Sequence, residues 1–165
     1  MRVAVLSSGG KDSAAAWWWA MCKGWSIECL ITVTITDDDS PMFQIPSTHL
    51  VEQQAKLAGL PWVEVKTSGV PPTDIQNLES AMKGLSIDGF VSGALASDYQ
   101  KSRLERMAER LGLRSWTPLW HQSGHEHVKG MIDHGFEIML TGVSAEGLTE
   151  EWLGRVLTHS SFEKL

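Results

Sequence analysis

A short loop near the start of the chain combines glycine, hydroxyl, cationic and acidic side chains. Its residues are Ser8, Gly9, Gly10, Lys11, Asp12 and Ser13. Glycines let the backbone approach an anion closely, while serine hydroxyls and a lysine ammonium supply donors and positive charge. Asp12 would repel phosphate unless a cation lay between them, and Mg²⁺ binds carboxylate and phosphate oxygens together. The loop therefore predicts a pyrophosphate site, with Asp12 as the magnesium ligand via the phosphates.

The spacing of this loop differs from that of two common nucleotide-binding motifs. A Walker A loop places a serine or threonine directly after its lysine, whereas Asp12 follows Lys11 here. The glycine pattern is also not the GxGxxG fingerprint of dinucleotide sites. A plain turn with solvated charges is the alternative interpretation. A strand before the loop and a helix after it favour anion binding, because backbone N–H groups converge at such a junction.

Alternating apolar runs predict the elements that hold the loop. Strands are expected at residues 3–7, 27–35, 62–66, 88–92 and 136–140. Helices are expected at residues 13–23, 47–58, 71–85, 98–111 and 125–134. This alternation predicts a doubly wound parallel α/β sheet with helices on both faces and strand order 3-2-1-4-5. We expect a single domain over residues 1–165, in which residues 148–165 form a helical C-terminal extension.

Two further loops follow predicted strands. In this strand order the first and fourth strands are neighbours where the order reverses, and ligands bind outside the carboxyl ends of the strands at that point. Gly93, Ala94 and Ser97 follow the fourth strand, and the first two are small enough for a nucleotide to lie against the backbone. Weaker candidates for binding phosphate or substrate are Gln100, Arg103, Gly142, Ser144 and Gly147. For Arg103 a solvated helix face is the alternative interpretation.

The segment SGGKDS resembles the signature of the N-type ATP pyrophosphatases, or PP-loop enzymes. Within that superfamily, three segments resemble the diphthine–ammonia ligase family. They are SGALASDYQ at 92–100, TPLW at 117–120, and GVSAEGL at 142–148 with EWLGR at 151–155. The resemblance implies an adenine nucleotide alpha hydrolase-like fold, with ATP and Mg²⁺ as cofactors. It also places adenine beside Val33 and Thr34, mainly through backbone groups.

The implied reaction is the adenylation of a carboxylate, with release of pyrophosphate and attack by ammonia. Lys11 and Asp12, with its Mg²⁺, are the catalytic candidates, because positive charge must stabilise the leaving pyrophosphate. The implied acceptor is diphthine on translation elongation factor two, and free ammonium is the simplest nitrogen source. Archaeal-type members continue past the point where this chain stops, so we expect the acceptor-binding part to be missing. The alternatives are a small-molecule carboxylate as acceptor, and an ATP- or AMP-binding module without catalysis.

The charge and cysteine content of the chain argue against some classes of binding partner. The formal net charge is −6, which disfavours a nucleic-acid surface, because neutralising phosphates requires clustered lysine and arginine. With no paired cysteines, the sulfur-transferring tRNA enzymes of the superfamily also fit poorly. We expect a cytoplasmic protein without a membrane partner.

Three consecutive tryptophans, Trp17, Trp18 and Trp19, cannot all face one core. A core contact together with a self-association surface is the favoured interpretation, which would make the protein a homo-oligomer.

Overall fold

The chain divides into two compact units, Met1–His121 and Gln122–Leu165. The computed structural model describes residues 1–37, 40, 42–43, 48–145 and 147–164. The first unit contains the sheet, and the second contains short helices. The division lies after residue 121, whereas the sequence predicts a helical extension beginning near residue 148. A single domain over residues 1–165 stays a prediction.

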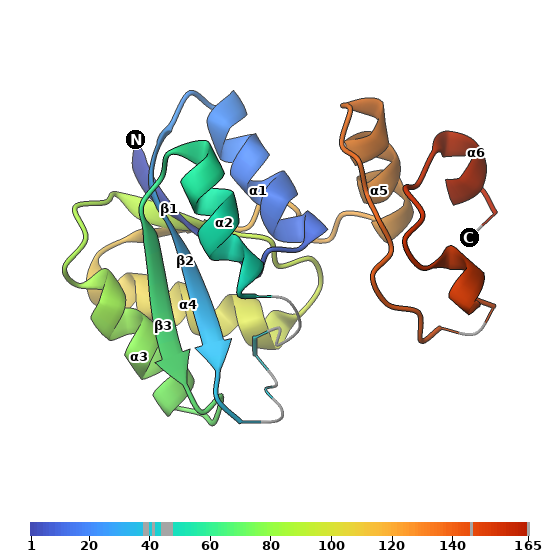
Figure 1. Ribbon diagram of the computed structural model, residues 1–165. Coiled ribbons are helices and arrows are strands. Elements are labelled where there is room, and N and C mark those ends of the chain that lie inside the picture. The colour runs from blue at the N-terminus through green and yellow to red at the C-terminus, as the bar shows by residue number, and fades with distance from the viewer. Residues whose placement is uncertain (38–39, 41, 44–47, 146, 165) are drawn as a thin grey trace. The chain divides into compact units, whose positions relative to one another are not determined.

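The first unit is built on a parallel sheet of five strands in the order β3-β2-β1-β4-β5. The strands are β1 (Arg2–Leu6), β2 (Ser26–Ile35), β3 (Trp62–Thr67), β4 (Gly89–Ser92) and β5 (Arg114–Trp116). Figure 1 shows the long β2 lying between β1 and β3. The predicted α/β class, parallel pairing and strand order are confirmed.

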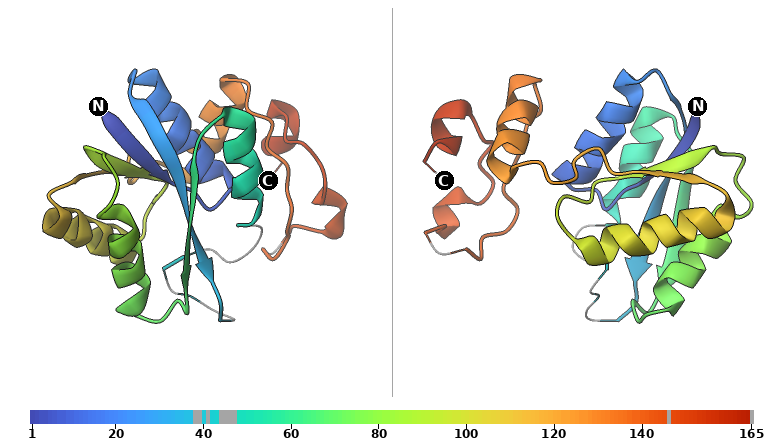
Figure 2. Two further views of the ribbon diagram at one scale, coloured as in Figure 1. Left: turned by 60° about the vertical axis from the view of Figure 1, so that its left-hand side comes forward. Right: turned by 180° about the vertical axis from the view of Figure 1, so that it is seen from behind.

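Two pairs of helices cover the two faces of the sheet (Figure 2). One face carries α1 (Lys11–Cys22) and α2 (Leu50–Ala58), and the other carries α3 (Thr73–Met82) and α4 (Asp98–Leu111). Successive strand residues point to opposite faces. Accordingly, Val3 packs with α1 and Val5 with α2, while Ala4 packs in the core beneath α3 and α4. All three are fully buried.

The identity of the fifth strand differs from the prediction. Residues 136–140 form no strand of the sheet, and Met139 makes only an isolated antiparallel bridge to Val156. The fifth strand is instead β5, which follows α4 after Gly112 and Leu113. Gly112 ends α4 in the left-handed conformation, and such a tight turn leads directly into the next strand. The longer apolar run at 136–140 misled the prediction, because β5 is a short edge strand.

The described residues of the second unit form three short helical elements. They are α5 (Gly124–Asp133), the 3₁₀ helix η1 (Glu150–Trp152) and α6 (His159–Phe162). Thr158 and Ser161 form a reciprocal capping box that starts α6. Among the described residues of both units, no helix has the length and apolar character that a membrane span requires.

The three consecutive tryptophans of α1 face different surroundings, as their helical spacing requires. Trp17 packs with the cluster beneath α2, and Trp19 packs with the cluster around Val3. The ring of Trp19 meets that of Trp25 edge-on, with centroids 5.2 Å apart. Trp18 remains 38% exposed. The expectation that they cannot share one core is confirmed, and self-association through this surface stays a prediction.

Candidate functional site

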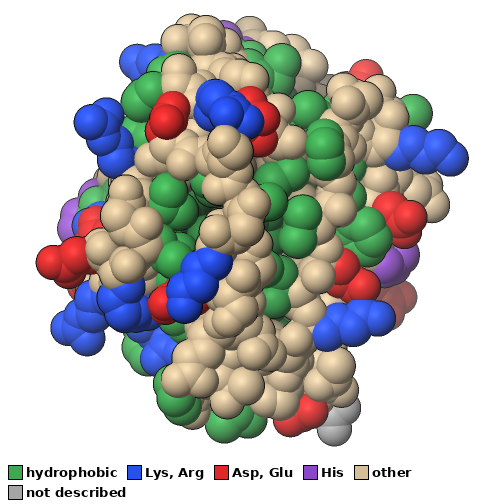
Figure 3. Space-filling model, turned by 90° about the vertical axis from the view of Figure 1, so that its left-hand side faces the viewer, with side chains coloured by type: hydrophobic (Ala, Val, Ile, Leu, Met, Phe, Trp, Pro, Cys, Tyr) green, Lys and Arg blue, Asp and Glu red, His purple; other side chains and the backbone are tan. Residues whose placement is uncertain are grey.

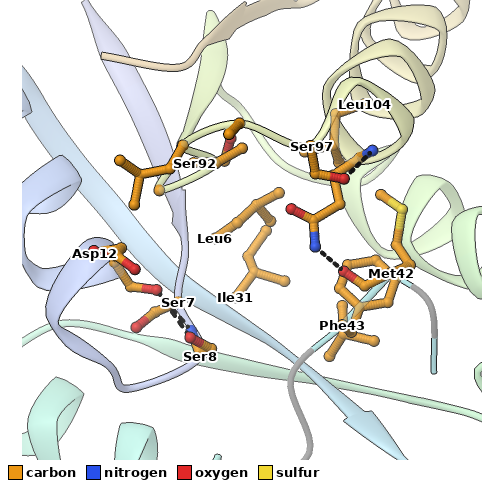
Figure 4. Close-up of a pocket in the computed structure, with 17 residues that line it drawn as sticks. Leu6, Ser7, Ser8, Asp12, Ile31, Met42, Phe43, Ser92, Ser97 and Leu104 are labelled. Carbon is orange, nitrogen blue, oxygen red and sulfur yellow. Dashed lines mark hydrogen bonds between the residues drawn. The ribbon is translucent and has the colours of Figure 1, made fainter. Parts of the chain in front are cut away.

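A pocket of about 320 Å³ opens at the carboxyl ends of β1 and β4. This is the point at which the strand order reverses, where doubly wound sheets bind ligands. Polar residues on one side come from the loop after β1, and apolar residues on the other come from strand ends, α4 and residues 42–43 (Figure 4). The sequence-based expectation that the loops after the first and fourth strands share one crevice is confirmed.

The loop of residues 8–13 is held in shape by its own side chains and by α2. The backbone N–H of Ser8 donates to Ser13 Oγ at 3.0 Å, and the two serine hydroxyl oxygens lie 3.1 Å apart. Gly9 adopts φ +83°, a conformation that glycine tolerates without strain. The side-chain amide of Gln54 donates to the carbonyl of Gly9 at 3.2 Å. These bonds fix the loop independently of any ligand.

The loop leads into an open helix end. Gly10 is the N-cap of α1 and offers no side-chain cap. The first N–H groups of an α-helix have no carbonyl partner within the helix, and the helix dipole makes this end positive. Ser8, Asp12 and Ser13 line the pocket beside it. The arrangement suits an anion of the size of a phosphate group.

Lys11 and Asp12 form an ion pair at 2.7 Å. Asp12 lies in the pocket wall, whereas Lys11, Gly9 and Gly10 belong to the same loop but not to the wall. The side chains of Lys11 and Asp12 are 40% and 33% exposed, so both ends of the pair can exchange partners. An entering phosphate would compete for the ammonium group.

Ser92, which the sequence-based reasoning missed, is the last residue of β4. It is 5% exposed, it lines the pocket, and its hydroxyl has no hydrogen-bond partner among the described residues. A buried hydroxyl without a partner costs free energy, so a ligand that bonds to it would remove that cost. The available signal was a polar residue ending an otherwise apolar strand, directly before Gly93.

Gly93 is needed for close packing of the backbone. A Cβ at this position would lie 2.6 Å from the carbonyl carbon of Asp12 and 2.9 Å from the amide nitrogen of Ser13. The loop after β4 therefore rests directly on the first turn of α1. Gly93 also lines the pocket, and its small size brings the two loops together. Binding of the nucleotide at Gly93 stays a prediction.

The remaining predicted residues after β4 lie in or near the pocket wall. Ala94, Ser97 and Gln100 line it. Ser97 caps α4 by accepting from the N–H of Gln100 at 3.3 Å, and the Gln100 side chain donates to the carbonyl of Met42 at 2.8 Å. Figure 4 shows both bonds beside Leu104. Gln100 thus joins the helix to the segment that closes the apolar side.

The apolar side of the pocket has the surface that a purine ring requires. Its residues are Leu6, Ile31, Val33, Met42, Phe43 and Leu104. Val33 lines the pocket, and its contact with adenine stays a prediction. The hydroxyl of Thr34 donates instead to Glu64 on β3 at 3.0 Å, because the next residue of a strand points to the opposite face. A contact through the backbone of Thr34 stays a prediction.

Arg103 lies outside the pocket wall. Its guanidinium donates to the fully buried carboxylate of Asp74 on α3 at 2.6 Å, and it lies over the ring of Tyr99. The residue therefore connects α4 to α3. A role in binding substrate or phosphate at the pocket stays a prediction.

Gly142, Ser144 and Gly147 belong to the second unit. Their expected place at the edge of the sheet required a strand at residues 136–140, and these residues form no strand of the sheet. Residue 146 of the same motif lies outside the described residues. A ligand-binding role for Gly142, Ser144 and Gly147 stays a prediction, supported by the family resemblance of the motif and not by sheet geometry.

Known proteins are similar to this chain in fold or in sequence. A crystal structure described as a predicted subunit of a tRNA methyltransferase from Methanocaldococcus jannaschii has a TM-score of 0.57 and 23% identity, and covers 89% of this chain and 82% of that one. This likeness supports the fold alone. The human diphthine–ammonia ligase is 29% identical over 95% of this chain and 67% of its own length.

Two other relatives carry the same name. The zebrafish (Danio rerio) diphthine–ammonia ligase is 31% identical, over 95% of this chain and 70% of its own length. The Schizosaccharomyces pombe diphthine–ammonia ligase is 27% identical, and the match covers only 29% of that longer protein. Residues 1–115, which contain the whole pocket and most of the sheet, match the family described as the diphthamide synthase N-terminal domain. The chain belongs to this family.

Proposed function

We propose that the chain is an ATP-dependent ligase that adenylates a carboxylate, releases pyrophosphate and promotes attack by ammonia to form an amide. One observation carries the proposal. A single pocket joins the open N-terminus of α1 to an apolar wall, and a nucleotide needs both of these features. The relatives named diphthine–ammonia ligase support the reaction class.

The polar end of the pocket suits the triphosphate. The hydroxyls of Ser8 and Ser13 and the first N–H groups of α1 are donors already in place. Lys11 is within reach of the same end, because its ammonium already meets Asp12 at 2.7 Å. When a carboxylate attacks the α-phosphate, negative charge builds on the departing pyrophosphate. Donors fixed before the reaction stabilise that charge without reorganising.

Asp12 fits the requirements for holding Mg²⁺. Its carboxylate is in the pocket wall and is partly exposed, and Mg²⁺ commonly binds through one or two carboxylates together with substrate phosphates and water. When bound, the ion supplies positive charge that polarises phosphate oxygens. The residues of this chain position the phosphates through the loop and α1.

The names of the relatives support a choice of acceptor. We propose diphthine on translation elongation factor two as the carboxylate and free ammonium as the nitrogen source. A translation factor as substrate places the enzyme in the cytoplasm. The apolar wall formed by Ile31, Val33 and Phe43 would then hold the adenine, and the loop at Gly93 and Ala94 would lie beside the reacting phosphate.

The test is to incubate the protein with Mg²⁺, ATP, ammonium and diphthine-modified elongation factor two, and to weigh the factor by mass spectrometry. We expect conversion of the carboxylate to the amide, with one AMP and one pyrophosphate formed per amide. Formation of ADP and phosphate would contradict the mechanism. Amidation of a small carboxylate without the factor would assign a different acceptor, and tight ATP binding without turnover would leave only a binding module.

A pair of variants links the activity to the loop. Lys11→Gln removes the ammonium beside the phosphates, so the rate of AMP formation should fall by roughly a hundredfold, as for the loss of a transition-state donor. Lys56→Gln removes the same charge from the exposed surface of α2. It should leave the rate unchanged. Equal rates for the two variants would exclude a catalytic role for Lys11.

A further inference from the structure

A second cavity, of about 520 Å³, lies between α3 and α4 and shares no residue with the nucleotide pocket. Helix α3 and the residues at its ends contribute Pro72, Ile75, Gln76, Glu79, Ser80 and Lys83. Helix α4 contributes Arg103, Arg106 and Arg110, which are spaced so that they share one side of a helix. We call this cavity the α3–α4 groove.

The charge of the groove is opposite to that of the protein. Lys83, Arg103, Arg106 and Arg110 line it, against the single lining carboxylate of Glu79. The formal net charge of the chain is −6. On the face shown in Figure 3, several lysine and arginine side chains lie close together at the lower left. A local excess of cations on an acidic protein is a focused site for an anion.

Ion pairs hold the two ends of the groove in place. At one end Arg103 donates to the buried Asp74 at 2.6 Å, while its own Nε is buried without a hydrogen-bond partner among the described residues. At the other end Arg110 bonds to Glu79 through Nε and Nη2, at 2.9 and 2.7 Å. The hydrogen bond from Arg110 lowers the pKa of Glu79, so this carboxylate stays ionised and keeps the arginine oriented.

Arg106 lies between these two pairs and is exposed. Among the described residues it makes no ion pair or side-chain hydrogen bond. Its position between two fixed guanidinium groups gives three planar donors on one side of α4. A guanidinium fork matches the oxygens of phosphate. Arg103 and Arg110 already use part of their donors on Asp74 and Glu79, so the fork of Arg106 is the one that can donate two N–H groups to an oxyanion.

From these contacts we propose that the α3–α4 groove is a second oxyanion site, which binds the phosphate group of a small ligand independently of the nucleotide pocket. Arg106 is the principal ligand, and Arg103 and Arg110 flank it. A cavity of this volume suits a small phosphorylated molecule. The overall negative charge opposes a long polyanion, so a free phosphate or a phosphomonoester fits better than nucleic acid.

The test uses the whole chain, labelled with ¹⁵N, and follows backbone amide shifts at low ionic strength. Inorganic phosphate and ribose 5-phosphate are the two probes. We expect saturable shifts of the backbone amides of Lys83, Arg106 and their neighbours. The amides of residues 8–13 report separately on binding at the nucleotide pocket. Tighter binding of ribose 5-phosphate identifies a phosphomonoester as the source, and equal binding identifies the free anion.

Two variants decide the assignment. Arg106→Gln should weaken binding at the groove by about tenfold, as expected for loss of a charge-assisted hydrogen bond. Arg114→Gln removes the same charge from the exposed end of β5, outside the groove, and should leave binding unchanged. Shifts that never saturate, or equal losses in both variants, overturn the proposal. Much tighter binding of a ten-nucleotide RNA than of either small probe would also overturn it.

Discussion

The side-chain amide of Gln54 donates to the carbonyl oxygen of Gly9 at 3.2 Å, although the two residues are 45 positions apart in the chain. Gln54 lies on α2, and Gly9 lies in the loop after β1 at φ +83°. The bond ties the loop to α2, and both of its residues lie outside the pocket wall. The loop then keeps the shape in which Ser8 and Ser13 line the pocket. Gln54 is therefore a positioning residue for the proposed reaction.

Replacing Gln54 should disturb the loop without disturbing the fold. We expect Gln54→Leu to lower kcat/KM for ATP by about tenfold, the effect of losing one hydrogen bond that orders a binding loop. Gln54→Glu keeps the size but loses the donor, so it should behave like the leucine variant. The control is Gln53→Leu, which changes an exposed neighbour. Steady-state kinetics check this, and wild-type behaviour of Gln54→Glu would contradict the role.

Gly93→Ala should destabilise the protein at the contact between β4 and α1. Its Cβ would lie 2.6 Å from a backbone carbon of Asp12, so the loop after β4 or the first turn of α1 must shift. We expect a loss of roughly 1–3 kcal/mol in the free energy of unfolding, as for overpacking. Gly84→Ala is the control, because its Cβ would meet no atom within 4 Å. Urea denaturation measures both.

Much of the fold follows from the sequence because strands and helices alternate strongly. Helix α4 was predicted with the bounds that the structure gives it, since Ser97 caps its start and Gly112 ends it. The predicted position of the fifth strand was wrong because β5 has only three residues and lies at the edge of the sheet. An apolar run such as 136–140 indicates that a segment is buried. A strand also needs a neighbouring strand with free backbone groups. Within this run only Met139 forms a bridge.

The sequence predicted the parts of the candidate site that depend on local motifs after neighbouring strands. It did not predict the contacts that depend on the packing of distant helices. The loop of residues 8–13 and Gly93 meet as expected, because both follow neighbouring parallel strands. No local pattern indicates that Arg103 turns to Asp74 on another helix, or that Gln54 supports Gly9. Such long-range partners depend on helix packing, which the spacing of residues within one helix leaves open.

Ser92→Ala should separate ligand binding from stability. The Ser92 hydroxyl is buried without a partner among the described residues and lines the nucleotide pocket. Its removal should leave the free energy of unfolding unchanged or slightly higher, and should weaken ATP binding by about two- to tenfold if the ligand bonds to it. Ser115 on β5 has an equally unpartnered hydroxyl but is outside the pocket.

The control is therefore Ser115→Ala, for which stability should respond in the same way and ATP affinity should not change. Calorimetric titration with a non-hydrolysable ATP analogue measures the affinity. Urea denaturation measures the stability. An ATP affinity that falls equally in both variants would remove Ser92 from the binding site, since only the wall of the pocket distinguishes the two hydroxyls.

The two cysteines should react very differently with a thiol reagent. Cys22 is exposed near the end of α1, whereas Cys29 is buried on β2 at 3% exposure. Burial raises the pKa of the Cys29 thiol to about 11, because a thiolate in an apolar core loses its solvation. In the native protein we expect one thiol to react rapidly and the second only after unfolding. Mass spectrometry of the alkylated protein identifies each.

The same burial makes stability depend on alkaline pH. The folded pKa of Cys29 lies above the unfolded value of 9.0, so the unfolded chain loses its proton first. The stabilisation that comes from the protonated Cys29 thiol is complete below pH 9 and is lost as the pH rises toward about 11. The slope is at most about 1.4 kcal/mol per pH unit. Urea denaturation should therefore show a steeper loss for the wild type than for Cys29→Ala, in which other titrating groups are unchanged. Parallel curves for the two proteins would mean that the thiol ionises without being desolvated.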